Sequence, residues 1–138
     1  MSGGPHVPKE TYEFTKHIPF SEHLGIKVDS LEKGVARLSM AIRPEFMTSW
    51  GTAHGGSILA LLDITLSMAA RTLYDPAPSV MTIDLSTQFI GTATGLLKAE
   101  ARVMKAGKST IFCEGEVKSE AGELVAKAIG TFRALTPK

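Results

Sequence analysis

The chain has 138 residues, 43% of them hydrophobic, with 15 basic and 14 acidic side chains and a formal net charge of +1. This length suits one globular domain with one core and leaves no room for a second catalytic domain. The near-neutral charge excludes the strongly basic balance with which proteins bind nucleic acid, so we expect no nucleic-acid partner.

The N-terminal residues show neither the basic segment nor the apolar run of a secretory signal. We expect residues 1–8 to form a flexible lead and residues 9–138 to form one domain. Cys113 is the only cysteine, so an intrachain disulfide cannot form and a cysteine-based zinc site is not indicated. A reducing, cytoplasmic setting fits this composition best.

The first elements are short. Residues 9–16 are predicted to form a helix, and residues 19–25, which start with Pro19 and end with Gly25, to form a turn. Apolar residues then alternate on both sides of a turn at residues 33–34, which predicts a hairpin ending near Pro44. Residues 45–53 match neither the helical nor the strand period, so we predict a loop.

Residues 55–70 are good helix formers and are apolar on nearly every side. Asp63 interrupts the run, and a bilayer crossing needs roughly 20 apolar residues, so we do not expect a membrane helix. A helix of this kind outside a membrane must be enclosed on most sides. The rest of the chain must therefore wrap it.

The second half supplies the wrapping. Apolar and polar residues alternate from Met81 to Phe89, from Leu97 to Val103, from Ile111 to Val117 and from Leu124 to Phe132, with turns at 106–107 and 120–122. The last three of these strands form a predicted meander. Two strands, one buried helix and four further strands predict an α+β fold in which an antiparallel sheet curls round a long central helix.

The start of that helix is a candidate anion or carbonyl site. His54 precedes Gly55 and Gly56, whose backbone N–H groups are not shielded by side chains and need partners. The helix dipole makes such N–H groups suited to an anion or a polarised carbonyl oxygen. The alternative is that the two glycines only ease a tight turn into the helix.

Asp63 is the only ionisable residue between His54 and Arg71. A carboxylate buried on an apolar helix is costly unless it is paired or used chemically, which makes Asp63 a candidate catalytic residue. The alternative is an aspartate that bonds a buried backbone group or faces solvent through a gap.

The spacing of Gly55 and Asp63 bears on assembly. The eight residues between them span roughly 12 Å of helix, so one substrate carbonyl cannot touch both. If the helix N-terminus polarises the carbonyl and the carboxylate attacks it or activates water, the two groups come from different copies of the chain. An antiparallel pair of helices in a twofold dimer would achieve this.

Residues 51–63, GTAHGGSILALLD, resemble the signature of the phenylacetic-acid-degradation-type (PaaI-like) hotdog thioesterases. The resemblance extends over nearly the whole domain. It implies the hotdog fold, hydrolysis of acyl-CoA thioesters without a metal or redox cofactor, and homodimers that pair into homotetramers.

The resemblance also implies roles for individual residues. Gly55 corresponds to the amide that holds the thioester oxygen, and Asp63 to the nucleophile or general base. Thr82 falls where relatives carry a Ser or Thr that orients the attacking water, although locally it is simply a polar residue on an alternating strand. His54 is expected to shape the turn through a hydrogen bond of its imidazole to the loop, and Gly56 to help bind the substrate.

One position departs from the family pattern. Many relatives have an Asn in the loop before the histidine, where this chain has Thr48, which lacks the carboxamide. Thr48 can still donate one hydrogen bond, so it is a candidate site residue that steadies the substrate. The departure puts in doubt which group steadies the thioester oxygen or the leaving sulfur.

The contacts to the rest of the substrate are less defined. Several basic residues on predicted strands are candidates for the CoA phosphates, although such charges are usually just solvated: Lys98, Arg102, Lys105 and Lys108. Apolar residues near the loop are candidates for the acyl pocket, although plain packing is the commoner role: Phe20, Leu24, Phe46, Met47 and Trp50.

Two other functions remain open at this point. Hotdog hydratases and dehydratases also combine a histidine with a helix carboxylate, but they need the imidazole as a working base. The position of His54 directly before two glycines favours hydrolysis. A non-catalytic acyl-CoA-binding module is the third possibility, and Asp63 argues against it.

Overall fold

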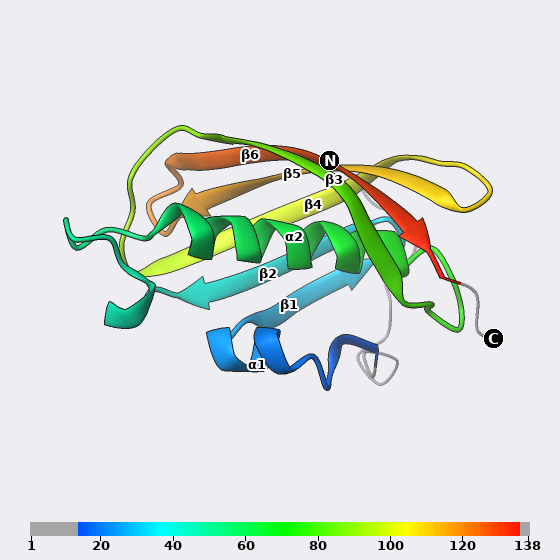
Figure 1. Ribbon diagram of the computed structural model, residues 1–138, viewed down its shortest axis with the longest axis horizontal. Coiled ribbons are helices and arrows are strands. Elements are labelled where there is room, and N and C mark those ends of the chain that lie inside the picture. Colours follow the sequence, from blue (N-terminus) through cyan, green and yellow to red (C-terminus); the bar gives the residue numbers. More distant parts are fainter. Residues whose placement is uncertain (1–13, 136–138) are drawn as a thin grey trace.

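The computed structural model of the chain describes residues 14–135. One six-stranded antiparallel sheet curves round a long helix, α2, which lies along its concave face (Figure 1). The elements in chain order are α1 (Pro19–Leu24), β1 (Lys27–Glu32), β2 (Val35–Ala41), η2 (Pro44–Phe46), α2 (Gly55–Arg71), β3 (Val80–Phe89), β4 (Leu96–Ala106), β5 (Thr110–Ser119) and β6 (Leu124–Ala134). This confirms the predicted hotdog architecture.

The start of the chain differs from the prediction. The expected flexible lead, residues 1–8, lies outside the described residues, as does most of the expected helix at 9–16. Residues 14 and 15 form a 3₁₀ turn and residue 16 a bend. The predicted turn at residues 19–25 is wrong, because this segment is the helix α1.

The residues that suggested a turn in fact delimit α1. Pro19 occupies the first turn, where a missing N–H costs nothing. Gly25 follows the helix with φ at +69°, and its N–H donates to the carbonyls of Ser21 and Glu22. Proline at the start and glycine just beyond the end are as typical of a short helix as of a turn.

The strand order in the sheet is β1-β2-β4-β5-β6-β3. The hairpin β1–β2 and the meander β4–β5–β6 are as predicted. Strand β3, which follows α2 along the chain, crosses to the far side and pairs with β6. Within residues 14–135, β3 therefore forms one edge of the sheet, and its outer backbone groups have no strand partner.

The helix α2 lies close to the middle of the sheet because two strand residues there have no side chain. A Cβ placed on Gly115 of β5 would lie 2.7 Å from Cδ1 of Leu66, and one on Gly130 of β6 would lie 3.1 Å from Cδ2 of the same leucine. Leu61, Leu62 and Leu66 are fully buried against the sheet. This packing fixes the depth of α2, and thus the position of Asp63.

No helix in the described part of the chain has both the length and the hydropathy needed to cross a bilayer.

Candidate active site

The N-terminus of α2 has one open amide. His54 is the N-cap, and its Nδ1 accepts a hydrogen bond of 2.8 Å from the N–H of Gly56. The N–H groups of Ser57 and Ile58 both donate to the carbonyl of His54. Among the described residues, the N–H of Gly55 has no acceptor. The dipole of a 17-residue helix lies behind this amide.

This geometry corrects the sequence analysis at two points. Gly56 was expected to help bind the substrate, but its N–H is already occupied by the imidazole of His54. The imidazole was expected to bond the preceding loop, whereas it caps the first turn of the helix. His54 therefore leaves Gly55 as the first-turn amide without an acceptor among the described residues.

The loop before α2 is held by its own hydrogen bonds. Thr48 Oγ1 accepts from the N–H of Trp50 at 3.2 Å and lies 3.0 Å from Oγ1 of Thr52. The N–H of Thr48 also donates to the carbonyl of Thr52 at 2.7 Å. The hydroxyl of Thr48 thus closes its own turn, so the structure gives no support to the expectation that it steadies the substrate.

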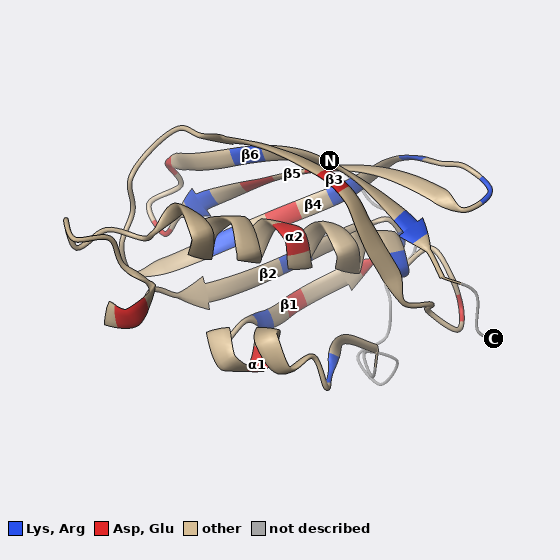
Figure 2. Ribbon diagram, in the orientation of Figure 1, with Lys and Arg blue, Asp and Glu red and all other residues tan. Residues whose placement is uncertain are grey.

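Asp63 lies two helical turns beyond Gly55 and is the only acidic residue of α2, seen as the red segment midway along that helix in Figure 2. Its side chain is half-buried. Oδ1 accepts a hydrogen bond of 2.7 Å from Oγ1 of Thr82 on β3. No further partner of the carboxylate occurs among residues 14–135, so Oδ2 is available to a substrate or a water molecule.

Thr82 is exposed and occupies a β-bulge of β3, where the register with β6 shifts between Thr82 and Asp84. A bulge redirects side chains at the edge of a sheet. Here the hydroxyl reaches across to the helix and holds one carboxylate oxygen. Both residues were predicted site residues, but the direct bond between them was not predicted.

The stripe of α2 that bears Asp63 is open in the single chain. Gly55, Leu59 and Asp63 are spaced by four residues, so they lie above one another on one face. Leu59 is 36% exposed, whereas Leu61 on the opposite face is fully buried. The helix is thus enclosed on most sides, as expected, and this stripe is the side that the described chain leaves open.

Cys113 is excluded as an alternative nucleophile. It lies on the helix-facing side of β5 and is fully buried. Burial raises the pKa of the Cys113 thiol to about 12. The thiol is therefore protonated at neutral pH, and the thiolate that would attack a thioester is absent.

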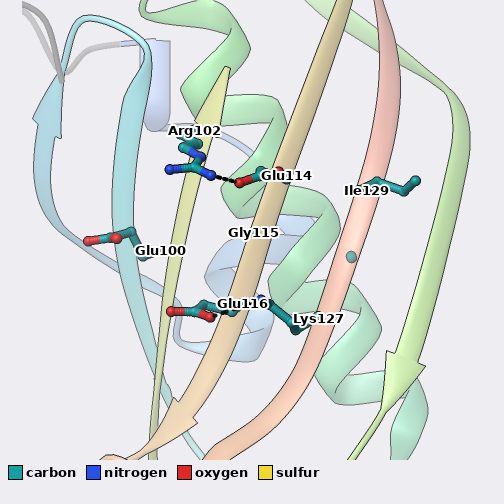
Figure 3. A pocket seen from close by; sticks show the side chains of 8 residues that line it. Glu100, Arg102, Glu114, Gly115, Glu116, Lys127 and Ile129 are labelled. Atoms are coloured by element: carbon teal, nitrogen blue, oxygen red, sulfur yellow. Dashed lines mark ion pairs between the residues drawn. The ribbon is translucent and has the colours of Figure 1, made fainter. Parts of the chain in front are cut away.

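Arg102 lies on the opposite side of the sheet from α2. Figure 3 shows its ion pair with Glu114, with the helix behind the strands. Both side chains line a groove of about 500 Å³ on the convex face. The groove holds three carboxylates, those of Glu100, Glu114 and Glu116, against only two basic side chains. Such a surface does not attract the phosphates of CoA, so the geometry does not support the predicted CoA contact of Arg102.

The three predicted lysines also fall into two groups. Lys98 is on the convex face, in register with Ser39 and Lys118. Lys105 and Lys108 lie at the exposed end of the β4–β5 hairpin. Thr110 of β5 pairs with Arg133 of β6, and Arg133 pairs with Met81 of β3. This end of the sheet therefore also carries the start of β3. Lys105 and Lys108 thus remain candidates for CoA binding.

The candidate residues for the acyl pocket do not form one cluster. Leu24 and Phe46 belong to the buried core, with exposures of 6% and 7%, so they serve packing. Met47 is half-buried. Phe20 and Trp50 are exposed, Trp50 by 89%. The structure therefore does not bring these five side chains together.

Phe89, at the end of β3, is a site residue that the sequence analysis missed. A Cβ placed on Gly55 would lie 3.6 Å from Cε1 of Phe89, so the ring lies beside the residue that carries the open amide. The alternation of β3 indicated that Phe89 faces the helix. Its contact with Gly55 depends on how β3 crosses the helix, which the pattern does not encode.

Comparison with known proteins places these features in a family. The sequence pattern of the thioesterase superfamily matches residues 51–126, which include Gly55, Asp63 and Thr82. The protein SSO2140 of Saccharolobus solfataricus, whose name assigns it only provisionally to the esterases, is 36% identical over 91% of this chain and 89% of its own length.

Two further matches bear on the activity and the fold. The medium/long-chain acyl-CoA thioesterase YigI of Escherichia coli K12 is 24% identical over 86% of this chain and 87% of its own length. The structure of E. coli PaaI, from the phenylacetic acid degradation operon, superposes with a TM-score of 0.85 at 19% identity, covering 92% of this chain and 91% of PaaI. The PaaI match concerns the fold alone.

Proposed function

Because the chain belongs to the thioesterase superfamily and is a hydrolase with the PaaI-like hotdog fold, we propose that it hydrolyses acyl-CoA thioesters to a free acid and CoA. The observation that carries the proposal is the pairing of an open helix amide at Gly55 with a half-buried carboxylate, Asp63, held by Thr82. A relative named as an acyl-CoA thioesterase supports this substrate class.

The chemistry assigns one task to each group. The N–H of Gly55 donates to the thioester oxygen and stabilises the negative charge that develops there. Asp63 attacks the carbonyl carbon through Oδ2 or takes a proton from a water molecule that attacks it. Thr82 orients the carboxylate through Oδ1. The C–S bond then breaks and CoA leaves as the thiol, with no metal or redox cofactor required.

Two copies of the chain are needed to complete this site. Gly55 and Asp63 lie roughly 12 Å apart along one helix, too far to act on one carbonyl. Leu59 lies midway between them on the open stripe. When two such stripes pair antiparallel about a twofold axis near Leu59, each Gly55 faces the Asp63 of the partner, as a self-complementary interface requires.

The edge strand supports the same arrangement. Strand β3 has Thr82 near its start, bonded to Asp63, and Phe89 at its end, against Gly55. Its outer edge is unpaired among the described residues. Two apolar side chains of the strand, Met81 and Ile83, are exposed by 46% and 54%. Antiparallel pairing of two β3 strands would bring the start of one strand toward the end of the other. Pairing of such dimers into tetramers stays a prediction.

The test of the function is release of free CoA thiol from a panel of acyl-CoAs, from acetyl-CoA to medium-chain and aryl-acyl-CoAs. We expect thiol release with at least one acyl group. Hydration of enoyl-CoA without thiol release would instead identify a hydratase. Tight binding with no turnover beyond that of Asp63→Asn would identify a binding module.

The variant Thr82→Val is expected to lower kcat by about tenfold, because it removes a hydrogen bond to a charged group. Thr82→Ser keeps the hydroxyl and is expected to retain most activity. Thr87→Val is the matched control on the same strand, since the buried hydroxyl of Thr87 has no partner among the described residues. Equal kcat values for Thr82→Val and the parent chain would remove Thr82 from the mechanism.

A further inference from the structure

Phe89 lies beside the open amide and yet is largely uncovered. In the register of β3 with β6 it pairs with Ala126, a fully buried residue on the helix-facing side of the sheet. Despite this register, the side chain of Phe89 is 53% exposed. Earlier in β3, Thr82 contacts the middle of α2 at Asp63. Phe89 lies beside the first turn of α2, where Gly55 has no side chain.

The ring and the amide therefore border the same space. Atoms Cε1, Cζ and Cδ1 of Phe89 lie 3.6, 3.7 and 3.9 Å from a Cβ placed on Gly55, which is ordinary contact distance. A thioester oxygen bonded to the N–H of Gly55 lies about 2.9 Å from the nitrogen. The carbon atoms attached to that carbonyl then lie a few ångströms from Gly55, the residue that the ring contacts.

We propose that Phe89 is a specificity-determining residue that binds the acyl group, favouring apolar acyl groups larger than acetyl. This inference rests on the proposed function, since it takes the N–H of Gly55 as the site of the thioester oxygen. The ring has no hydrogen-bonding group, so the binding free energy is most favourable when the ring covers an apolar acyl chain and removes it from water. The pantetheine arm, with two amides to satisfy, gains less from this surface.

The test compares Phe89→Ala and Phe89→Leu with the parent on acetyl-, hexanoyl- and phenylacetyl-CoA. We expect kcat/KM of Phe89→Ala to fall about tenfold or more for hexanoyl- and phenylacetyl-CoA and less than threefold for acetyl-CoA. The kcat/KM of Phe89→Leu is expected to lie between the values of Phe89→Ala and the parent chain. Phe112→Ala is the control, because Phe112 is a partly exposed phenylalanine on the convex face, 40% exposed.

The same comparison is made for binding, by calorimetry with hexanoyl-CoA and acetyl-CoA in chains that also carry Asp63→Asn. A selective loss of hexanoyl-CoA affinity in the Phe89→Ala chain supports the proposal even if the parent chain hydrolyses nothing, in which case only the proposed hydrolysis fails.

Two outcomes would overturn the role of Phe89. One is an equal loss for all three substrates in a Phe89→Ala chain that is folded by circular dichroism, since a merely structural ring would act in this way. The other is hydrolysis by the parent chain with unchanged acyl preference in the variant. If the Asp63→Asn chain with native Phe89 bound no acyl-CoA and the parent chain released no thiol, both proposals would be overturned.

Discussion

Asp63→Asn is expected to lower kcat for acyl-CoA hydrolysis by about 10³-fold, the contribution typical of a positioned acid or base. The amide keeps an oxygen that accepts the hydrogen bond of Thr82, and the side chain is half-buried, so the fold has little reason to change. What is lost is the negative charge that attacks the thioester or takes the proton of water. The measurement is steady-state thiol release, with the melting temperature recorded for the same samples.

The matched control for this variant is Asp84→Asn. Asp84 lies on β3, two residues beyond Thr82, and its side chain is exposed. We expect this chain to hydrolyse at the parental rate. If Asp63→Asn also kept more than a tenth of the parental kcat, the carboxylate would be a structural feature of the helix and the chemistry would reside elsewhere.

Much of the fold follows from periodicity. The β1–β2 hairpin and the meander of β4, β5 and β6 alternate well enough to predict strands despite their register shifts, and α2 has a long apolar run without proline that predicts a helix. The helix α1 was mistaken for a turn because Pro19 and Gly25 delimit both structures. Six residues are too few for the helical period to outweigh these two signals.

The candidate site was proposed from residue types, and its contacts came from the structure. Gly55, Asp63 and Thr82 were proposed because an N-terminal glycine, a lone carboxylate on an apolar helix and a matching family signature agree. The bond between Asp63 and Thr82 joins residues 19 apart in the sequence and depends on the bulge in β3. No local pattern specifies where that bulge directs a side chain.

The contacts that differ from expectation have one physical origin, the direction in which a side chain points. Gly55 and Gly56 are adjacent glycines, but the imidazole of His54 accepts from the amide of Gly56 only. Histidine is not among the residues that commonly cap helices, so the cap was not foreseen. Arg102 has a suitable charge for the phosphates of CoA, yet the pleat of β4 directs its side chain to the convex face, where it forms an ion pair with Glu114.

Gly55→Pro is expected to lower kcat by about 10²-fold, because it deletes the amide hydrogen assigned to the oxyanion while sparing the helix. Gly55 is the first helical residue, where proline is favoured. His54 before it has φ −66° and ψ 141°, a conformation that a following proline accepts. The N–H that is lost has no acceptor among the described residues, so no protein hydrogen bond is broken.

The control for the proline variant is Gly55→Ala, which adds a Cβ but keeps the N–H. That Cβ would meet Phe89 at 3.6 Å without a clash, so both variants are expected to melt near the parental temperature. The difference in kcat between Gly55→Ala and Gly55→Pro isolates the hydrogen-bond donor. If the two variants had equal kcat, the oxyanion would be stabilised by another group.

The proline variant also tests the shared site, because it can be combined with Asp63→Asn in mixed dimers. A heterodimer of the two chains has one site with neither change and one site with both. Random mixing makes about half of the dimers mixed, so the mixture is expected to recover about a quarter of the parental activity, although each variant alone is nearly inactive. If heterodimers verified by native mass spectrometry stayed inactive, Gly55 and Asp63 of one chain would have to act together, and the roughly 12 Å between them would rule out this mechanism.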